Sequence, residues 1–222
     1  MSSAVSEVVK IVPTITAHDP HQYAMQLERD ESVSKRIHLD ICDGEFAPTT
    51  TVNLEQSYWH EKTEADLHLM INKPGMRTEI CISLNPSLVI IHVEASDYGY
   101  VSKTEMLEQL KAVGIKTGIA LLPHTAVQTV EDLITKVDHV LIFGGRLGYQ
   151  GSNLQKDVLP KIAQVKAINH GVEVGWDGGV DNTNAAEVIK AGADVLNVGG
   201  FIQKAEDPKK AYDKLLQIAQ EV

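Results

Sequence analysis

Eight short aliphatic runs recur at regular intervals along this chain of 222 residues. Their composition predicts strands at residues 9–16, 36–42, 65–71, 88–94, 116–122, 139–144, 172–177 and 194–199. Strands that alternate with helices form a parallel sheet with right-handed crossovers. Eight such units in a chain of this length predict an α/β fold of the (β/α)₈ barrel (TIM barrel) type, with residues 1–222 as a single domain. An open doubly wound sheet is the alternative, but no G-x-G-x-x-G motif follows the first strand to support it.

Helix signals fill the segments between these strands. Asp19 followed by Pro20 predicts an N-cap and the first turn of a helix that runs through residues 22–29. Asp207 and Pro208 open the last helix in the same way. Apolar residues at helical spacing predict four further helices, at residues 104–112, 129–135, 154–168 and 181–190.

Composition excludes several classes of function. Apolar residues make up 43% and charged residues 23% of the chain, as in ordinary globular proteins. A net charge of −10 argues against nucleic acid or an anionic membrane as a partner, because both need clustered Lys and Arg. No apolar stretch approaches the length of about 18 residues expected of a membrane span. Residues 1–10 lack the pattern of a secretory signal, so we expect a cytoplasmic protein. Cys42 and Cys81 form no C-x-x-C pair, which argues against a disulfide framework or a structural zinc site.

Polar residues gather toward the carboxyl ends of the predicted strands, where barrel enzymes place their chemistry. Because successive side chains point to opposite faces of a strand, His38 and Asp40 share one face of the strand at 36–42, while aliphatic residues occupy its other face. His68 and Asp177 occupy comparable positions on other strands. A lone strand histidine is usually a hydrogen-bonded core residue, but two imidazoles and two carboxylates together could hold a divalent metal and move protons. A residue pair on strand four, His92 and Glu94, is expected to support this set by hydrogen bonds or to be structural.

Six motifs along the chain resemble those of the ribulose-phosphate 3-epimerase family, in the family's order and spacing. They are PTI at 13–15, IHLDICDG at 37–44, DLHLM at 66–70, IHVEA at 91–95, WDGGV at 176–180 and AGADVLNVGG at 191–200. The resemblance covers nearly the whole chain. It implies a (β/α)₈ barrel that inverts C3 of D-ribulose 5-phosphate to give D-xylulose 5-phosphate.

The resemblance also implies the site. It assigns His38, Asp40, His68 and Asp177 as ligands of one divalent metal ion, and Asp40 and Asp177 as the acid and the base on opposite faces of the substrate. Such a ligand set suits Zn²⁺, Fe²⁺, Mn²⁺ or Co²⁺, and no organic cofactor is expected.

Substrate-binding residues are expected on several strand ends and loops. Two glycine pairs precede a helix expected near Asp181 and a turn at Phe201, where bare N–H groups would face a phosphate, and a glycine-rich loop follows strand six. The full predicted set is Thr14, His68, Met70, Gly148, Tyr149, Gln150, Gly151, Gly178, Gly179, Gly199 and Gly200.

Departures from the family pattern cluster around the substrate and spare the metal ligands. Thr14 stands for Ser, Cys42 and Phe143 stand for Met, Glu45 stands for His, and Gln150 interrupts the glycines of the strand-six loop. The reaction type is therefore expected to hold while the sugar stays open. Ribulose 5-phosphate is the default substrate, and a hexulose phosphate such as allulose 6-phosphate is the alternative.

Two other functions compete with epimerisation. Decarboxylases and aldol synthases of related fold carry an Asp-x-Lys-x-x-Asp pattern, whereas the stretch at 40–43, DICD, has no lysine. A sugar-phosphate binding protein without turnover is the second competitor, and the complete set of four ligands argues against it. The family resemblance further suggests a homo-oligomer.

Overall fold

Closure of the sheet follows from pairing between its first and last strands: β1 pairs in parallel with both β2 and β8, and every other strand pairs with its neighbours in sequence order. The computed structural model describes residues 9–222, so most of the segment that bears on a secretory signal lies outside the described residues. The strands are β1 (Lys10–Ile15), β2 (Arg36–Cys42), β3 (Glu64–Met70), β4 (Leu88–His92), β5 (Lys116–Leu121), β6 (His139–Phe143), β7 (Glu173–Asp177) and β8 (Val195–Val198). The predicted (β/α)₈ barrel is confirmed, and each predicted strand overlaps an observed one.

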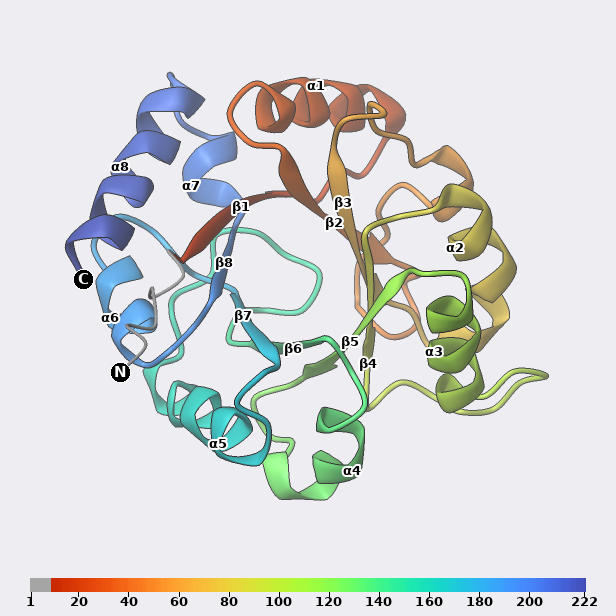
Figure 1. Cartoon of the computed structure of the whole chain (residues 1–222). Helices are drawn as coiled ribbons and strands as arrows, with labels where there is room; N and C mark the ends of the chain where they lie inside the picture. Colours follow the sequence, from red (N-terminus) through yellow and green to blue (C-terminus); the bar gives the residue numbers. More distant parts are fainter. Residues whose placement is uncertain (1–8) are drawn as a thin grey trace.

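Helices surround the barrel, and the loop between β6 and α5 lies over its centre (Figure 1). The α-helices are α1 (Pro20–Glu31), α2 (Thr78–Leu84), α3 (Lys103–Ala112), α4 (Glu131–Ile134), α5 (Pro160–Ile168), α6 (Ala185–Lys190), α7 (Gly200–Gln203) and α8 (Pro208–Glu221). Short 3₁₀ turns occur at Leu54–Gln56, Pro74–Arg77, Val127–Val130 and Lys156–Val158. Within residues 9–222, no helix combines the length and the apolar character needed to cross a membrane.

Helix predictions held where a capping residue marks the start. The side chain of Asp19 accepts a hydrogen bond from the backbone N–H of Gln22 at 2.9 Å, and Asp207 caps α8 through the N–H of Lys210. The predicted helix at 104–112 is confirmed as α3. The segment at 129–135 is instead a 3₁₀ turn followed by the short α4.

Two predicted helix starts are wrong, and two helices were not predicted: α2, and the short α7, where only a turn was expected. The helix predicted at 154–168 begins at Pro160, because proline lacks the N–H that a helix interior needs and fits only the first turn. The helix predicted at 181–190 begins at Ala185, because the carboxylate of Asp181 accepts hydrogen bonds from the N–H and hydroxyl of Thr183 in a local turn. Helix α2 buries only Thr78 and Cys81, so its buried positions show little of the apolar periodicity that predicts a helix.

The two faces of each strand meet different surroundings. On β2, Ile37, Leu39 and Ile41 face outward into the main core, which lies between the barrel and its helices. Inside the barrel a separate small apolar cluster forms from Leu88, Ile90, Ala120 and Leu141. The alternation therefore directs the remaining inward positions of β2, including His38 and Asp40, to the barrel interior.

An ion-pair network closes the end of the barrel where the strands begin. The guanidinium of Arg36 donates to Asp66 at 2.8 Å and to both carboxylate oxygens of Glu173, at 3.0 and 2.8 Å. Glu173 also accepts from Lys10 and contacts Nδ1 of His139 at 2.9 Å. Buried carboxylates need such partners, because an unpaired buried charge is costly.

We expect Arg36→Met to lower the free energy of unfolding by about 3–5 kcal/mol, because the carboxylates of Asp66 and Glu173 lose their buried partner. Lys10 also pairs with Glu173 but is half exposed, so Lys10→Met should lower it by less than about 1 kcal/mol. Urea unfolding followed by circular dichroism at neutral pH measures both. Equal losses of unfolding free energy in the two variants would show that the pairing of Arg36 stabilises the fold no more than an exposed ion pair does.

Candidate metal and catalytic site

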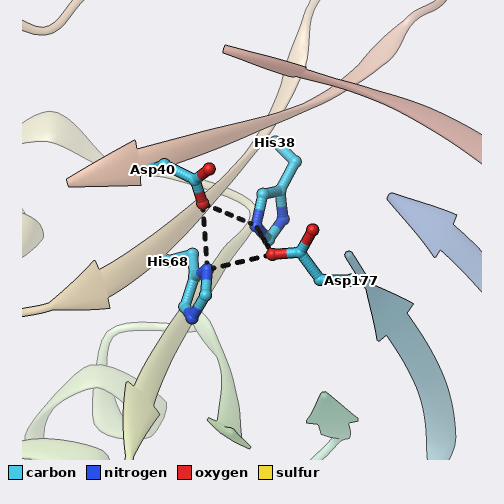
Figure 2. A group of neighbouring side chains, drawn as sticks. All are labelled: His38, Asp40, His68 and Asp177. Atoms are coloured by element: carbon cyan, nitrogen blue, oxygen red, sulfur yellow. Dashed lines mark hydrogen bonds and ion pairs between the residues drawn. The ribbon is translucent and has the colours of Figure 1, made fainter. Parts of the chain in front are cut away.

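Four side chains converge in the barrel interior from three strands: His38 and Asp40 from β2, His68 from β3 and Asp177 from β7 (Figure 2). Nδ1 of His68 lies 3.0 Å from Oδ1 of Asp40 and 3.6 Å from Oδ2 of Asp177. Nε2 of His38 lies 3.4 Å and 4.0 Å from the same two oxygens. One ligand atom from each residue lies within 4.8 Å of all the others. The structure thus brings together the four residues predicted to bind the metal.

Polar atoms of this cluster are buried without enough partners inside the protein. All four residues are buried, and within residues 9–222 neither ring nitrogen of His38 nor Oδ2 of Asp177 has a hydrogen-bond partner. Burial lowers the pKa of His38 to about 4, so its imidazole is neutral at neutral pH and keeps a lone pair for a metal. A cation at this point would satisfy Nε2 of His38 and Oδ2 of Asp177, and two imidazoles with two carboxylates suit a divalent transition metal. The four side chains form a cluster that could hold a metal ion.

The two carboxyl groups differ in their affinity for a proton. Burial raises the pKa of a carboxyl, but at Asp40 the adjacent imidazoles of His38 and His68 outweigh burial and hold the pKa below its ordinary value. At Asp177, burial and the negative charge of Asp40 together raise the pKa well above its ordinary value. Two carboxyls whose environments separate their pKa values in this way can serve as base and acid.

The pair predicted to support the ligands, His92 and Glu94, lies directly behind His68. Nε2 of His92 is 2.9 Å from Nε2 of His68, and Nδ1 of His92 is 3.3 Å from Oε2 of Glu94. Burial lowers the pKa of His92 to about 4, whereas at Glu94 hydrogen bonds from His92 and Thr125 outweigh burial and lower the pKa to about 2. His92 is therefore neutral and Glu94 ionised at neutral pH.

A cavity of about 310 Å³ opens above the cluster. Its wall includes both carboxylates, Asp40 and Asp177, while His38 and His68 are fully buried behind them. Of the predicted substrate-binding residues, all but His68 line the cavity: Thr14, Met70, Gly148, Tyr149, Gln150, Gly151, Gly178, Gly179, Gly199 and Gly200. His68 contacts the two carboxylates that line the cavity.

The loop after β6 is tied to the barrel through Gln150. The amide nitrogen of Gln150 donates to the carbonyl of Thr14 at 3.1 Å and to the hydroxyl of Thr16 at 3.0 Å. The Thr16 hydroxyl donates in turn to Oδ2 of Asp40 at 2.7 Å. The side chain that interrupts the glycines therefore connects the loop to a carboxylate of the cluster.

Asn197 and Lys204 line the cavity but were not among the predicted site residues. Asn197 is a polar residue in an apolar strand segment, so the polarity signal that found His38 could have found it. Asn197 lies beside Asp177 in the sheet register and lines the cavity. Lys204 also lines the cavity, but it follows the short α7 and no pattern in the sequence marks it.

The expected helix start near Asp181 is wrong, so the predicted helix N-terminus does not follow Gly178 and Gly179 directly. Both glycines adopt left-handed backbone conformations, with φ of 115° and 72°. A Cβ on Gly178 would lie 2.2 Å from the backbone nitrogen of Gly145, so only glycine fits there. Close backbone approach, rather than a helix end, is what this segment contributes to the cavity.

Fold and site together define a class: a (β/α)₈-barrel enzyme with a buried His and Asp cluster beneath a cavity formed by loops at the carboxyl ends of the strands. Residues 10–203 match the Ribulose-phosphate 3 epimerase family, and the chain belongs to that family. Family membership makes it an isomerase-class enzyme and is consistent with the pentose phosphate pathway.

Individual relatives agree with this assignment. The chain is 30% identical over 221 residues to ribulose-phosphate 3-epimerase of Helicobacter pylori (strain J99 / ATCC 700824), covering 96% of this chain and 99% of the relative. It is 28% identical over 217 residues to the Bacillus subtilis (strain 168) enzyme of the same name, covering 94% and 98%. A crystal structure of 3-hexulose-6-phosphate synthase from Salmonella typhimurium superimposes with a TM-score of 0.69 at 14% identity, covering 96% and 99% of the two chains. That similarity shows the shared fold alone.

Purified protein should contain about one divalent transition metal ion per chain, and His38→Ala or His68→Ala should lose most of it. Each variant removes one of the buried imidazole ligands. His60 is exposed and remote from the cluster, so His60→Ala is the matched control and should keep the metal. Elemental analysis of the three variants gives the answer. Unchanged metal content in both His38→Ala and His68→Ala would exclude a metal centre at this cluster.

Proposed function

We propose that this chain inverts C3 of a ketose phosphate, converting D-ribulose 5-phosphate to D-xylulose 5-phosphate. The observation that carries the proposal is that Asp40 and Asp177, the two carboxylates of the cluster, both reach the cavity wall while the imidazoles lie behind them. A substrate in the cavity would meet two carboxyl groups that come from strands β2 and β7, which β1 and β8 separate in the barrel.

Two acid–base groups are what the reaction needs. C3 lies next to the C2 ketone, so a base can remove its proton to give an enediolate, and an acid can return a proton to the other face. A single group would tend to return the proton to the face it left. Asp40, with its lowered pKa, is suited to accept a proton, and Asp177, with its raised pKa, to donate one. The roles exchange in the reverse direction.

General acid–base catalysis alone gives about 10²–10⁴-fold acceleration, whereas enzymes commonly reach 10⁶-fold or more. A divalent ion held by His38, Asp40, His68 and Asp177 would supply Lewis-acid stabilisation of the negative charge that develops on the substrate oxygens. The burial of the cluster keeps water away and strengthens this effect.

Polar atoms on the cavity wall suit a sugar phosphate. Within residues 9–222, the buried hydroxyl of Thr14 and the side-chain oxygen of Asn197 have no hydrogen-bond partner, which leaves them for substrate hydroxyls. Lys204 supplies a positive charge beside the glycine backbone of Gly151 and Gly200, which suits a phosphate. The cavity thus has the two carboxyl groups of Asp40 and Asp177 at one end and the positive charge of Lys204 at the other.

Several residues that depart from the family pattern lie at the cavity wall or directly behind it. Phe143 lines the cavity, and Cys42 lies behind the lining residue Met70 with its sulfur 3.9 Å from the Met70 sulfur. Thr49 donates to the carbonyl of Gly148 at 2.8 Å and ties the loop after β2 to the loop after β6. These contacts shape the space for the carbons around C3, and so they decide between a pentulose and a hexulose.

Incubating metal-loaded protein with ketose phosphates in deuterated water tests reaction type and sugar together. We expect deuterium at C3 and formation of the C3 epimer, with a higher kcat/KM for ribulose 5-phosphate than for a hexulose 6-phosphate. NMR and coupled assays measure both. Equal kcat/KM values would show that the pocket does not discriminate. Absence of both exchange and epimer would identify a binding protein without turnover.

Asp177→Asn should lower the rate of epimerisation by about 10²–10⁴-fold, because an amide cannot exchange a proton with C3. Asp40 should still exchange deuterium into the one epimer whose C3 hydrogen faces it, so deuterium exchange at C3 should continue while inversion is lost.

Metal content must be measured in the same sample, because an amide is a poorer ligand than a carboxylate. Metal-loaded Asp177→Asn that epimerises at the normal rate would contradict a two-base mechanism.

A further inference from the structure

A continuous series of polar groups extends behind His68, away from the two carboxylates of the cluster. The ring of His68 presents Nδ1 to Asp40 and Nε2 to Nε2 of His92, at 3.0 and 2.9 Å. The ring of His92 presents its other nitrogen to Oε2 of Glu94. His68 and His92 are fully buried, so no water competes for these positions. Each ring nitrogen in the series must therefore donate to, or accept from, a neighbouring group of the same series.

A cation at the cluster fixes where each proton lies. A metal-binding nitrogen carries no proton, so the ring proton of a metal-bound His68 lies on Nε2 and is donated to Nε2 of His92. Nε2 of His92 is then the acceptor, and the proton of His92 lies on Nδ1. That N–H points at the carboxylate of Glu94, which is ionised and can only accept. All three groups are satisfied in this one order.

The reverse order leaves a conflict. With a proton on Nδ1 of His68 donated to Asp40, Nε2 of His68 becomes an acceptor and His92 must donate from Nε2. Nδ1 of His92 then presents a lone pair to the Glu94 carboxylate, and two acceptors face each other in a buried site. Glu94 thus disfavours the order in which Nδ1 of His68 is blocked by a proton.

We propose that Glu94, acting through His92, is a positioning residue that holds the proton of His68 on Nε2 and so keeps Nδ1 of His68 available to a metal ion. The inference rests on the metal centre of the proposed function. It concerns the two residues behind the ligand, neither of which lines the cavity.

The surroundings of Glu94 determine how it responds to substitution. Its other oxygen, Oε1, accepts from the backbone N–H of Leu122 at 2.9 Å and from the hydroxyl of Thr125. Lys161 holds the same loop by donating to the carbonyls of Leu122 and Thr125, at 2.8 and 2.6 Å. In Glu94→Gln, the amide oxygen must stay on the Leu122 side to accept these bonds. The amide NH₂ is then directed at Nδ1 of His92 and donates where the carboxylate accepted.

Glu94→Gln therefore keeps the shape of the side chain and reverses its preference. It favours a proton on Nε2 of His92 and on Nδ1 of His68, which a metal must displace. We expect the dissociation constant for Zn²⁺, measured by competition with a chromophoric chelator, to rise by about 10–100-fold.

A matched control exists elsewhere in the chain. One oxygen of Glu31 accepts from the backbone N–H of His60 and from the hydroxyl of Thr63, and its other oxygen faces Nδ1 of His60. This is the same arrangement as at Glu94, without a connection to the cluster. Glu31→Gln should leave the Zn²⁺ dissociation constant unchanged.

Nitrogen-15 NMR of histidine side chains tests the proton order without any substitution. In the zinc-loaded protein, we expect Nδ1 of His92 to carry the proton and Nε2 to carry none. A proton on Nε2 of His92, or a Glu94→Gln affinity equal to that of the unmodified protein, would overturn the inference while leaving the metal centre intact. Failure of the unmodified protein to bind Zn²⁺ through His38 and His68 would overturn the metal centre and the inference together.

Discussion

Two carboxylates and two imidazoles meet within 4.8 Å in the interior of this barrel, and the site depends on an interaction that offsets the cost of burying them. A buried carboxylate is costly unless it is paired. The other end of the same barrel shows the ordinary solution, in which Arg36 pairs with both Asp66 and Glu173. At the cluster, the partners that approach Asp40 and Asp177 are histidines and a threonine, and His38 is neutral. A divalent cation held by the cluster would supply the missing positive charge.

The barrel allows this arrangement because outward side chains of each strand form the stabilising core, while inward side chains are free to form the cluster. Outward residues such as Leu39 and Leu67 pack against the helices, and so the inward positions need not contribute to that core. Register then aligns the polar residues of neighbouring strands: Asp40 lies opposite His68, and Asp177 lies between Phe143 and Asn197. The four candidate ligands therefore lie on strands, while the loops above them form much of the cavity wall.

Strand positions and the metal cluster could be predicted from the sequence because both depend on alternation over a few residues. A single polar residue at an inward position of an apolar strand, as at His38 or His68, is a strong local signal. Contacts between distant segments leave no such signal. Thr16 meets Gln150 across the cavity mouth, and Lys204 reaches the cavity only because α7 ends beside the loop after β6. Helix starts failed where a local side-chain turn or a proline outweighed apolar spacing, as at Asp181 and Pro160.

We infer that Asp40 and Asp177 address opposite faces of a substrate held above one metal ion. A crystal structure with the metal and a phosphorylated hydroxamate, which resembles the planar enediolate, is the direct test of this arrangement. We expect a metal ion bound by His38, Asp40, His68 and Asp177, with the two carboxylates on opposite sides of the ligand plane and the phosphate near Lys204. Both carboxylates on one side of that plane, or a metal bound elsewhere, would contradict it.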